Sequence, residues 1–205
     1  MAYVLGFFTA DGSMIKNKRG AHFIEFQITD RDLLFKIRKT LGSEHKIATR
    51  KRNGNWKTIY RLQIGSGEMF NDLLALGMLP RKSKIISLPE IPDKYFSHFL
   101  RGYFDGDGNV VSTKYRRADR NNRVYTTVLS GFTSGSKIFL EKMHTKIKRL
   151  AGVSGGTLYF HGRGHRLFFS VKDSLSLYNF MYNGSEKDLF LARKKKIFEK
   201  YFNIG

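Results

Sequence analysis

The 205-residue sequence has no cysteine, three prolines, one tryptophan and few acidic side chains. The lack of cysteine excludes disulfides and thiolate metal sites, and it is compatible with a reducing interior. No apolar run approaches the roughly 20 residues that a membrane span needs, and the N-terminus lacks a basic region leading into a cleavable signal. We therefore expect a soluble, intracellular protein, with its compartment left open.

The shortage of acidic residues leaves a large excess of positive charge. Asp and Glu number 17 against 37 Lys and Arg, which gives a formal net charge of +20. Self-repulsion on this scale destabilises a compact fold unless a polyanion neutralises it, and nucleic acid is the usual polyanionic partner. A ribosome-type protein or a solubilising surface is the alternative, with a membrane surface more distant. Hydrophobic residues make up 41% of the chain and include 18 Phe, so a sizeable core is expected.

Two segments of the chain match in residue type and order. Residues 4–12 read VLGFFTADG, and residues 100–108 read LRGYFDGDG. A second match follows each, at residues 79–82 (LPRK) and 191–194 (LARK). Internal repeats at domain spacing indicate two structurally similar units. We place these units at residues 1–88 and 89–205, joined at the proline-containing segment 88–92 (LPEIP).

Each unit alternates helical and extended patterns in the same order. In the first, the Asp-Gly segment precedes strands at 14–15 and 23–28, a helix at 30–41, two strands around the Asn53-Gly54 turn and a helix at 68–76. In the second, a strand pair at 109–133, a helix at 137–150, a hairpin at 162–164 and C-terminal helices follow. The predicted fold class is α+β, with two pseudo-symmetric αββαββα repeats.

The segment that ends in Asp11 has the pattern of a central helix. Residues 3–10 are apolar nearly all round, so a helix there must be buried on every side. Gly6 and Gly102 occupy matching places, and a mid-helix glycine costs about 1 kcal/mol, which close approach of two helices would offset. A carboxylate at a helix C-terminus opposes the macrodipole, and a nearby cation would reverse that penalty. Asp11 and Asp107 are therefore predicted to lie side by side at one end of a two-helix interface.

Two other interpretations of the aspartates are a turn or strand cap, and a calcium loop. A turn or cap explains either aspartate alone, but it does not explain a duplicated pattern in a strongly basic chain. Residues 105–109 (DGDGN) read like the start of an EF-hand loop. The sixth position of that loop is Val110 instead of Gly, and the twelfth is Arg116 instead of Glu, so the calcium loop is excluded.

The two segments, their spacing and the basic matches that follow them resemble the LAGLIDADG homing endonucleases of the single-chain, two-motif type, over nearly the whole chain. The resemblance implies saddle-shaped antiparallel sheets, a central two-helix interface and a monomer with internal pseudo-two-fold symmetry. It also implies site-specific hydrolysis of double-stranded DNA across the minor groove, which is only about 6 Å wide. Dissimilar strands in the two halves indicate a long, asymmetric target. Intron or intein mobility is the expected context, and an intron maturase or a non-cleaving binding protein is the alternative.

The resemblance assigns metal binding to the ends of the two motifs. Asp11 and Asp107 would hold divalent metal, assisted by the backbone carbonyls of Ala10 and Gly106. Mg²⁺ is the expected ion because it prefers carboxylate, carbonyl and phosphate oxygens, and Mn²⁺ or Ca²⁺ fit the same sites.

The resemblance assigns a second role to the basic matches. Lys82 and Lys194 correspond to the family's active-site lysines, which polarise the water network or stabilise charge at the cleaved phosphate. Ordinary phosphate contact is the alternative for both. The sixth motif position is Thr9 in one copy and Asp105 in the other, a departure that we expect to affect helix packing more than metal binding.

The strands should lie along the major groove, with alternate side chains reading bases. If Ile24, Phe26 and Leu62 face the core, the opposite face exposes polar side chains, although a solvated face is the alternative for any one of them. The candidate DNA-binding residues of both repeats are Asn17, Arg19, Glu25, Gln27, Arg50, Arg52, Arg61, Gln63, Thr113, Tyr115, Arg117, Arg163 and Arg166.

Four other polar residues have a structural and a functional interpretation. Asp30 and Ser136 stand at helix starts, where the family often has a water-positioning residue, and we favour N-capping for both. His161 and His165 flank the turn at 162–164. Because no third ligand accompanies them, a DNA-facing hairpin is favoured over a histidine-metal nuclease.

Overall fold

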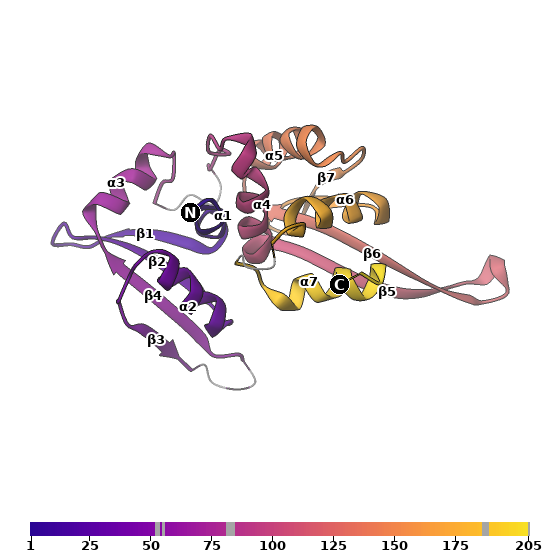
Figure 1. The fold of residues 1–205 in the computed structure, drawn as a ribbon, viewed down its shortest axis with the longest axis horizontal. Coiled ribbons are helices and arrows are strands. Elements are labelled where there is room, and N and C mark those ends of the chain that lie inside the picture. The colour runs from indigo at the N-terminus through magenta and orange to yellow at the C-terminus, as the bar shows by residue number, and fades with distance from the viewer. Residues whose placement is uncertain (52–53, 55, 81–84, 186–188, 205) are drawn as a thin grey trace.

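Each half of the chain contains one four-stranded antiparallel sheet (Figure 1). The computed structural model describes residues 1–51, 54, 56–80, 85–185 and 189–204, and in these residues the strand orders are β1-β2-β4-β3 and β5-β6-β8-β7. The predicted α+β class with two repeats is confirmed. The strands are β1 (Gly12–Lys16), β2 (His22–Ile28), β3 (Ile47–Arg50), β4 (Ile59–Gly65), β5 (Gly108–Arg117), β6 (Arg123–Ser134), β7 (Thr157–His161) and β8 (Gly164–Phe169).

The helices follow the predicted order in both halves. The motif helix of the second half begins before the apolar motif itself and is longer than that of the first. The helices are α1 (Ala2–Asp11), α2 (Arg31–Thr40), α3 (Gly67–Ala75), α4 (Asp93–Asp107), α5 (Lys137–Ala151), α6 (Val171–Tyr182) and α7 (Ala192–Phe202), with a 3-10 turn, η2 (Ala118–Arg120), at the tip of the β5–β6 hairpin.

The helix that follows the second strand of each sheet has an N-cap side chain at its start. The carboxylate of Asp30 accepts a hydrogen bond from the backbone N–H of Leu33 at 3.0 Å. The hydroxyl of Ser136 accepts one from the N–H of Phe139 at 3.3 Å. The predicted N-capping role of both residues is confirmed. Each cap satisfies an N–H that the first helical turn leaves without a partner.

The two sheets share one register relative to the motif helices. Gly12 pairs with Phe26 and Gly108 with Phe132, so the residue after each motif aspartate enters its sheet at the same place. Phe26 and Phe132 in turn pair with leucines of β4 and β8 and point inward. The helix-strand junction that carries each aspartate is therefore built in the same way twice.

The core is centred on the contact between α1 and α4. Phe7, Phe8, Phe99 and Phe104 of these helices are at most 1% exposed, as the all-round apolar pattern predicted. In Figure 1, α1 and α4 lie between the two sheets, and α6 and α7 lie over β5 and β6. The helices α5, α6 and α7 contact the second sheet, and they lie on one of its faces. Among the described residues, no helix covers the other face of this sheet.

Several predicted features fall outside the described residues or remain predictions. Asn53 of the predicted Asn-Gly turn lies outside them, whereas Gly54 adopts a φ of 77°. The division at residues 88 and 89 remains a prediction, because the buried cluster runs without a break through both halves. Among the described residues, no helix has the length and apolar character needed to cross a membrane.

Candidate active site

The two motif helices touch through their glycines. A Cβ atom placed on Gly6 would lie 2.0 Å from the carbonyl oxygen of Phe99, and one placed on Gly102 would lie 2.0 Å from that of Tyr3. These distances leave no room for a side chain, so the backbones are in direct contact. The contacts are reciprocal, as expected when two copies of one motif meet across a pseudo-two-fold axis.

The same packing brings the two motif ends together. A Cβ atom placed on Gly106 would lie 2.4 Å from Cβ of Ala10 and 3.2 Å from Oδ2 of Asp11. The Asp11 carboxylate is therefore packed against the residue that precedes Asp107. Asp11 is exposed and Asp107 is half-buried, so both are open to solvent at one end of the helix pair.

Tyr103 is a buried residue of α4 whose pKa is affected by the charges of both carboxylates. Its hydroxyl donates a hydrogen bond to the carbonyl oxygen of Thr133 at 2.8 Å. Burial raises the pKa of Tyr103 well above its ordinary value, and the negative charges of Asp107 and Asp11 raise it further. One buried phenol thus lies within the electrostatic reach of both aspartates, and it stays protonated as a donor.

Lys194 lies against the end of α4 instead of facing solvent. Its Nζ donates to the carbonyl oxygens of Phe104 at 2.6 Å, Asp105 at 2.9 Å, Gly106 at 3.3 Å and Gly108 at 2.7 Å. An ammonium has three protons, so these four contacts are shared. The side chain is 6% exposed, and burial lowers its pKa to about 8 against the opposing attraction of Asp105.

This geometry identifies a cation at the C-terminus of the second motif helix. The macrodipole argument required a positive charge there, and the Lys194 ammonium provides one. With four backbone acceptors around it, Lys194 holds the helix end in place, which is a different task from direct contact with a phosphate. Its counterpart Lys82 lies outside the described residues.

Asp105, at the sixth motif position, is part of a buried network. It accepts hydrogen bonds from the hydroxyl of Tyr3 at 2.7 Å and from the N–H of Leu191 at 2.8 Å. Burial raises the pKa of Asp105 to about 6, while these two hydrogen bonds oppose the rise. The counterpart Thr9 bonds to the carbonyl of Leu5 on its own helix at 2.7 Å. The departure at this position therefore affects packing, and Asp105 links α4 to α1 and to the segment that precedes α7.

The donor set at the motif ends fits a hard divalent cation. The candidate donors are the carboxylates of Asp11 and Asp107 and the backbone carbonyls of Ala10 and Gly106, all of them oxygens, and the Gly106 carbonyl also accepts from Nζ of Lys194 at 3.3 Å. The described residues contain no group of three or more His, Cys, Asp or Glu side chains that could hold a metal. Mg²⁺ is commonly bound by one or two carboxylates, with water and substrate phosphate completing the octahedron, so two carboxylates are sufficient.

The outward face of the first sheet carries a polar network. Glu25 accepts hydrogen bonds from Nε2 of Gln27 at 2.6 Å and of Gln63 at 3.2 Å, and Nη1 of Arg61 lies 3.7 Å from its carboxylate. The expectation that Glu25 is exposed is wrong, because these three neighbours cover it and leave it 5% exposed. Gln27 and Arg61 are exposed, and Gln63 is half-buried.

The remaining candidates of the first repeat lie at the ends of its strands. Arg50 shares the outward face with Arg61, because Ala48 pairs with Arg61 and side chains alternate along β3. The side-chain oxygen of Asn17 accepts hydrogen bonds from the N–H groups of Arg19 and Ala21, both at 2.9 Å, so Asn17 shapes the β1–β2 turn. Arg19 is exposed, and Arg52 lies outside the described residues.

Candidates of the second repeat share one face of the long β5–β6 hairpin and its neighbour. Thr113, Tyr115 and Arg117 alternate along β5, and the register continues across the sheet to Arg166 on β8. Arg163 lies in the turn between β7 and β8. The histidines flanking this turn point to opposite faces, since His161 pairs with Gly164 while His165 pairs with Phe160. They do not form a common metal site.

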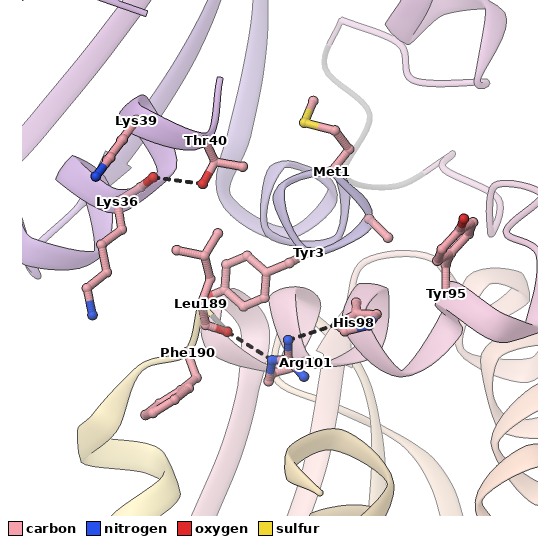
Figure 2. A pocket seen from close by; sticks show the side chains of 11 residues that line it. Met1, Tyr3, Lys36, Lys39, Thr40, Tyr95, His98, Arg101, Leu189 and Phe190 are labelled. Atoms are coloured by element: carbon pink, nitrogen blue, oxygen red, sulfur yellow. Dashed lines mark hydrogen bonds between the residues drawn. The ribbon is translucent and has the colours of Figure 1, made fainter. Parts of the chain in front are cut away.

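A cavity of about 890 Å³ lies at the other end of the helix pair (Figure 2). Lys36 and Lys39 of α2 line one side, and Arg101 lines another. The Arg101 guanidinium is 2% exposed and donates to the carbonyls of Leu189 at 2.9 Å and Met181 at 2.6 Å. Arg101 therefore serves to hold the helices together, and the cavity contains none of the residues predicted for the site.

Two features of this region were not predicted from the sequence. The capping role of Lys194 follows from the packing of the start of α7 against the end of α4, which no local sequence pattern specifies. The apolar outward face of the second sheet was also missed. The adjacent Val110 and Val111 were a signal for it, because neighbouring strand residues point to opposite faces and one of two consecutive valines must then face outward. Both depend on which face of an element meets the rest of the fold.

Comparisons with known proteins agree with this architecture. The sequence model of the LAGLIDADG-like domain matches residues 1–76. Among solved structures, LAGLIDADG meganuclease I-CpaMI bound to uncleaved DNA is similar with a TM-score of 0.67 and 12% identity, covering 98% of this chain and 89% of that one. I-SmaMI bound to an uncleaved DNA target in the presence of calcium ions has a TM-score of 0.56 and 16% identity, covering 100% and 85%.

A further similar structure is the N-terminal LAGLIDADG domain of DUF199/WhiA, with a TM-score of 0.57 and 17% identity, covering 88% of this chain and 79% of that one. A search of curated protein sequences finds no significant match. The fold and the paired motif helices define a two-repeat protein of the LAGLIDADG type. Residues 1–76 match the LAGLIDADG-like domain, and the chain as a whole has the fold of the LAGLIDADG structures to which it is similar.

Proposed function

We propose that this protein is a monomeric, site-specific endonuclease that cleaves double-stranded DNA with divalent metal held by Asp11 and Asp107. The observation that carries the proposal is the close packing of the two motif helices at Gly6 and Gly102. This packing brings the carboxylate of Asp11 against Gly106, the residue before Asp107. The net charge of +20 suits a polyanionic substrate, and two carboxylates at one point suit a divalent cation that would contact it. The calcium ions in the I-SmaMI–DNA structure support divalent metal as the cofactor.

The chain's own residues would hold the reacting phosphates and the helix ends in position. Asp11 and Asp107 would each serve one strand across the minor groove, whose width of about 6 Å suits two adjacent carboxylates. Lys194 would keep the second motif end fixed through its carbonyl contacts. Tyr103 would hold the same helix against β6 through its hydrogen bond to the Thr133 carbonyl. Divalent metal, when bound, supplies charge relief at the phosphate and an activated water, so no protein general base is required. Lys82 is proposed as the matching lysine of the first repeat.

Selection of cleaved sites from a randomised duplex library with Mg²⁺ tests the proposal. We expect recovery of one long, asymmetric sequence that is cut on both strands. Replacing Asp11→Asn or Asp107→Asn should abolish double-strand cleavage, because each change removes one carboxylate charge from the metal site. Binding to the selected site in Ca²⁺ should remain close to that of the unchanged protein.

Asp32→Asn provides the matched control. Asp32 is an exposed aspartate in the first turn of α2, away from the motif ends, so its removal should leave cleavage unchanged. Unchanged double-strand cleavage by the Asp11→Asn protein would show that the metal site lies elsewhere.

The second candidate is an intron maturase or another nucleic-acid-binding protein that does not cut. One observation favours it: Nζ of Lys194 already donates to the carbonyl of Gly106, an oxygen that the resemblance assigns to metal. Specific binding without Mg²⁺-dependent cleavage of any selected site would favour this candidate.

A further inference from the structure

An apolar strip crosses the second sheet on the face that no described helix covers. We define the apolar strip as Val111, Leu129, Phe168 and Tyr159. Val111 pairs directly with Leu129 across β5 and β6, and these two side chains are 45% and 43% exposed. Tyr159, which is 41% exposed, lies with its ring 6.4 Å from that of Phe168. Four large side chains without polar atoms, apart from one hydroxyl, thus gather on an open sheet face.

Strand alternation fixes the direction in which the apolar strip points. The intervening residues Val110, Val128 and Leu167 are at most 6% exposed and face the helices. The apolar strip must therefore face away from the core. Arg166, which pairs with Tyr159, shares this outward face. Since a core already exists on the inner side, the outward apolar residues are not needed for it.

The first sheet has different chemistry at the matching positions. Gly12 pairs with Phe26 and Gly108 pairs with Phe132, so Phe26 and Phe132 are equivalent positions. The residues just before them, Glu25 and Gly131, are therefore equivalent too. Glu25 pairs with Gln63 in the first sheet, and Gly131 pairs with Phe168 in the second. A Cβ atom on Gly131 would lie 2.9 Å from the ring of Phe168, so this ring covers the glycine. A hydrogen-bonding pair in one repeat is replaced by an apolar surface in the other.

Apolar side chains read a base pair through the one apolar group that the major groove presents, the C5-methyl of thymine. We propose that the apolar strip contacts thymine methyl groups in the half of the target bound by the second repeat. The first repeat would read its half through hydrogen bonds from Gln27, Arg61 and Gln63. This inference rests on the proposed function, and it names the base composition that the second repeat selects.

The charge around the apolar strip favours DNA over another protein as its occupant. Arg117 and Arg123 pair across the hairpin on the same face, and Arg166 lies beside the strip. A second copy of this chain would bring two molecules of formal charge +20 together, which long-range repulsion opposes. Duplex DNA offers negative phosphates to the arginines and methyl groups to the apolar strip.

The test replaces thymine by uracil, which removes only the methyl group, at each thymine of the selected target in turn. Affinity is measured in Ca²⁺ so that cleavage does not interfere. We expect one or more thymines, all in one half-site, at which the change weakens binding by about fourfold, the effect of one buried methyl group. In the Val111→Ser, Leu129→Ser protein at least one of these thymines should lose its sensitivity to uracil, because two of the four apolar side chains are gone.

Val124→Ser is the matched control. Val124 is 51% exposed on the same hairpin, but it pairs with Arg116 and points to the opposite face. Its replacement should leave the uracil effect intact. Circular dichroism should give the same unfolding temperature for the unchanged protein, the double serine variant and the Val124→Ser protein.

The outcomes separate the inference from the proposed function. If the library yields a bound, cleaved site whose thymines all tolerate uracil, the inference is wrong and the proposed function stands. The inference is also wrong if the serine variants change self-association while DNA affinity is unaltered. If no site is bound or cut at all, the proposed function fails together with the inference.

Discussion

Lys194 combines a buried charge with a structural task at the end of a helix. The last carbonyls of a helix lack intrahelical partners, and here one ammonium lies within hydrogen-bond distance of three carbonyls at the end of α4 and of the Gly108 carbonyl that follows it. Burial lowers its pKa to about 8 against the attraction of Asp105, so the charged form stays dominant at neutral pH. The position of Asp107 therefore depends on a side chain from the C-terminal helix.

Replacing Lys194→Met should lower the free energy of unfolding by about 2 kcal/mol or more, because several buried carbonyls lose their donor. Urea denaturation measures this loss. Lys196→Met, which changes an exposed lysine on the same helix, should stay within about 0.5 kcal/mol of the unchanged protein. A Lys194→Met protein of full stability that binds DNA weakly would instead make Lys194 a phosphate contact.

Asp93 at the start of α4 gives the protein a pH-dependent contact. Its carboxylate receives hydrogen bonds from both Nη atoms of Arg149, at 2.6 and 2.9 Å, and Lys146 lies 3.2 Å away. Hydrogen bonds from Arg149 and then Lys146 lower the pKa of Asp93 below its ordinary value of 3.8. The contact therefore stabilises the fold above that value, and the stabilisation is lost as the pH falls through the lower folded-state pKa.

Asp93→Asn should accordingly be less stable than the unchanged protein at neutral pH. The difference should shrink as the pH falls through the folded-state pKa of Asp93, because the carboxylate then becomes protonated in both states. Thermal unfolding of both proteins across this pH range measures the effect. A stability difference that does not change with pH would mean that the charge of Asp93 is not involved.

At the scale of elements, the fold depends on two helices whose backbones touch. Glycine is unfavourable within a helix, and here it is required because the partner carbonyl lies 2.0 Å from where a Cβ would be. The spacing of Gly6 and Ala10, and of Gly102 and Gly106, places small residues on one face of each helix. Close approach of these faces sets the separation of the two motif aspartates.

Replacing Gly6→Ala or Gly102→Ala should destabilise the protein by about 1–3 kcal/mol or more, because overpacking forces the helices apart. Cleavage should fall more steeply than stability, since the two carboxylates separate. Gly67→Ala is the control: this glycine begins α3 with no neighbouring atom within 4 Å of an added Cβ. It should be neutral or stabilising, and equal losses at all three positions would contradict the close contact.

At the scale of the whole molecule, charge sets how the protein meets its substrate. The net charge of +20 spans both repeats, and the outward sheet faces carry arginines in each. Counterion release makes such binding strongly dependent on salt, whatever the sequence of the DNA.

Binding affinity should fall by about a thousandfold or more between about 50 and 200 mM salt, as for proteins with several phosphate contacts. Fluorescence anisotropy with the selected duplex gives the slope. An unrelated duplex should give a similar slope at lower affinity, because phosphate contacts carry no sequence information. A nearly flat plot would be inconsistent with a phosphate-tracking surface.

The sequence by itself determined the repeat, the order of the elements and the apolar character of the motif helices. These are local properties: strand alternation in β2, capping at Asp30 and Ser136, and the all-round apolar segment before Asp11 each need only neighbouring residues. The duplicated Asp-Gly ends could also be located, because both copies are written in full in the chain.

Only the tertiary structure decided which polar residues are buried and which apolar ones are open. Glu25 reads as an exposed residue of an alternating strand, yet Gln27, Gln63 and Arg61 arrive from neighbouring positions and cover it. Lys194 reads as one basic residue in a basic run, yet its place in the first turn of α7 brings its ammonium against the end of α4. Burial depends on contacts between residues far apart in the chain, and local sequence does not encode them.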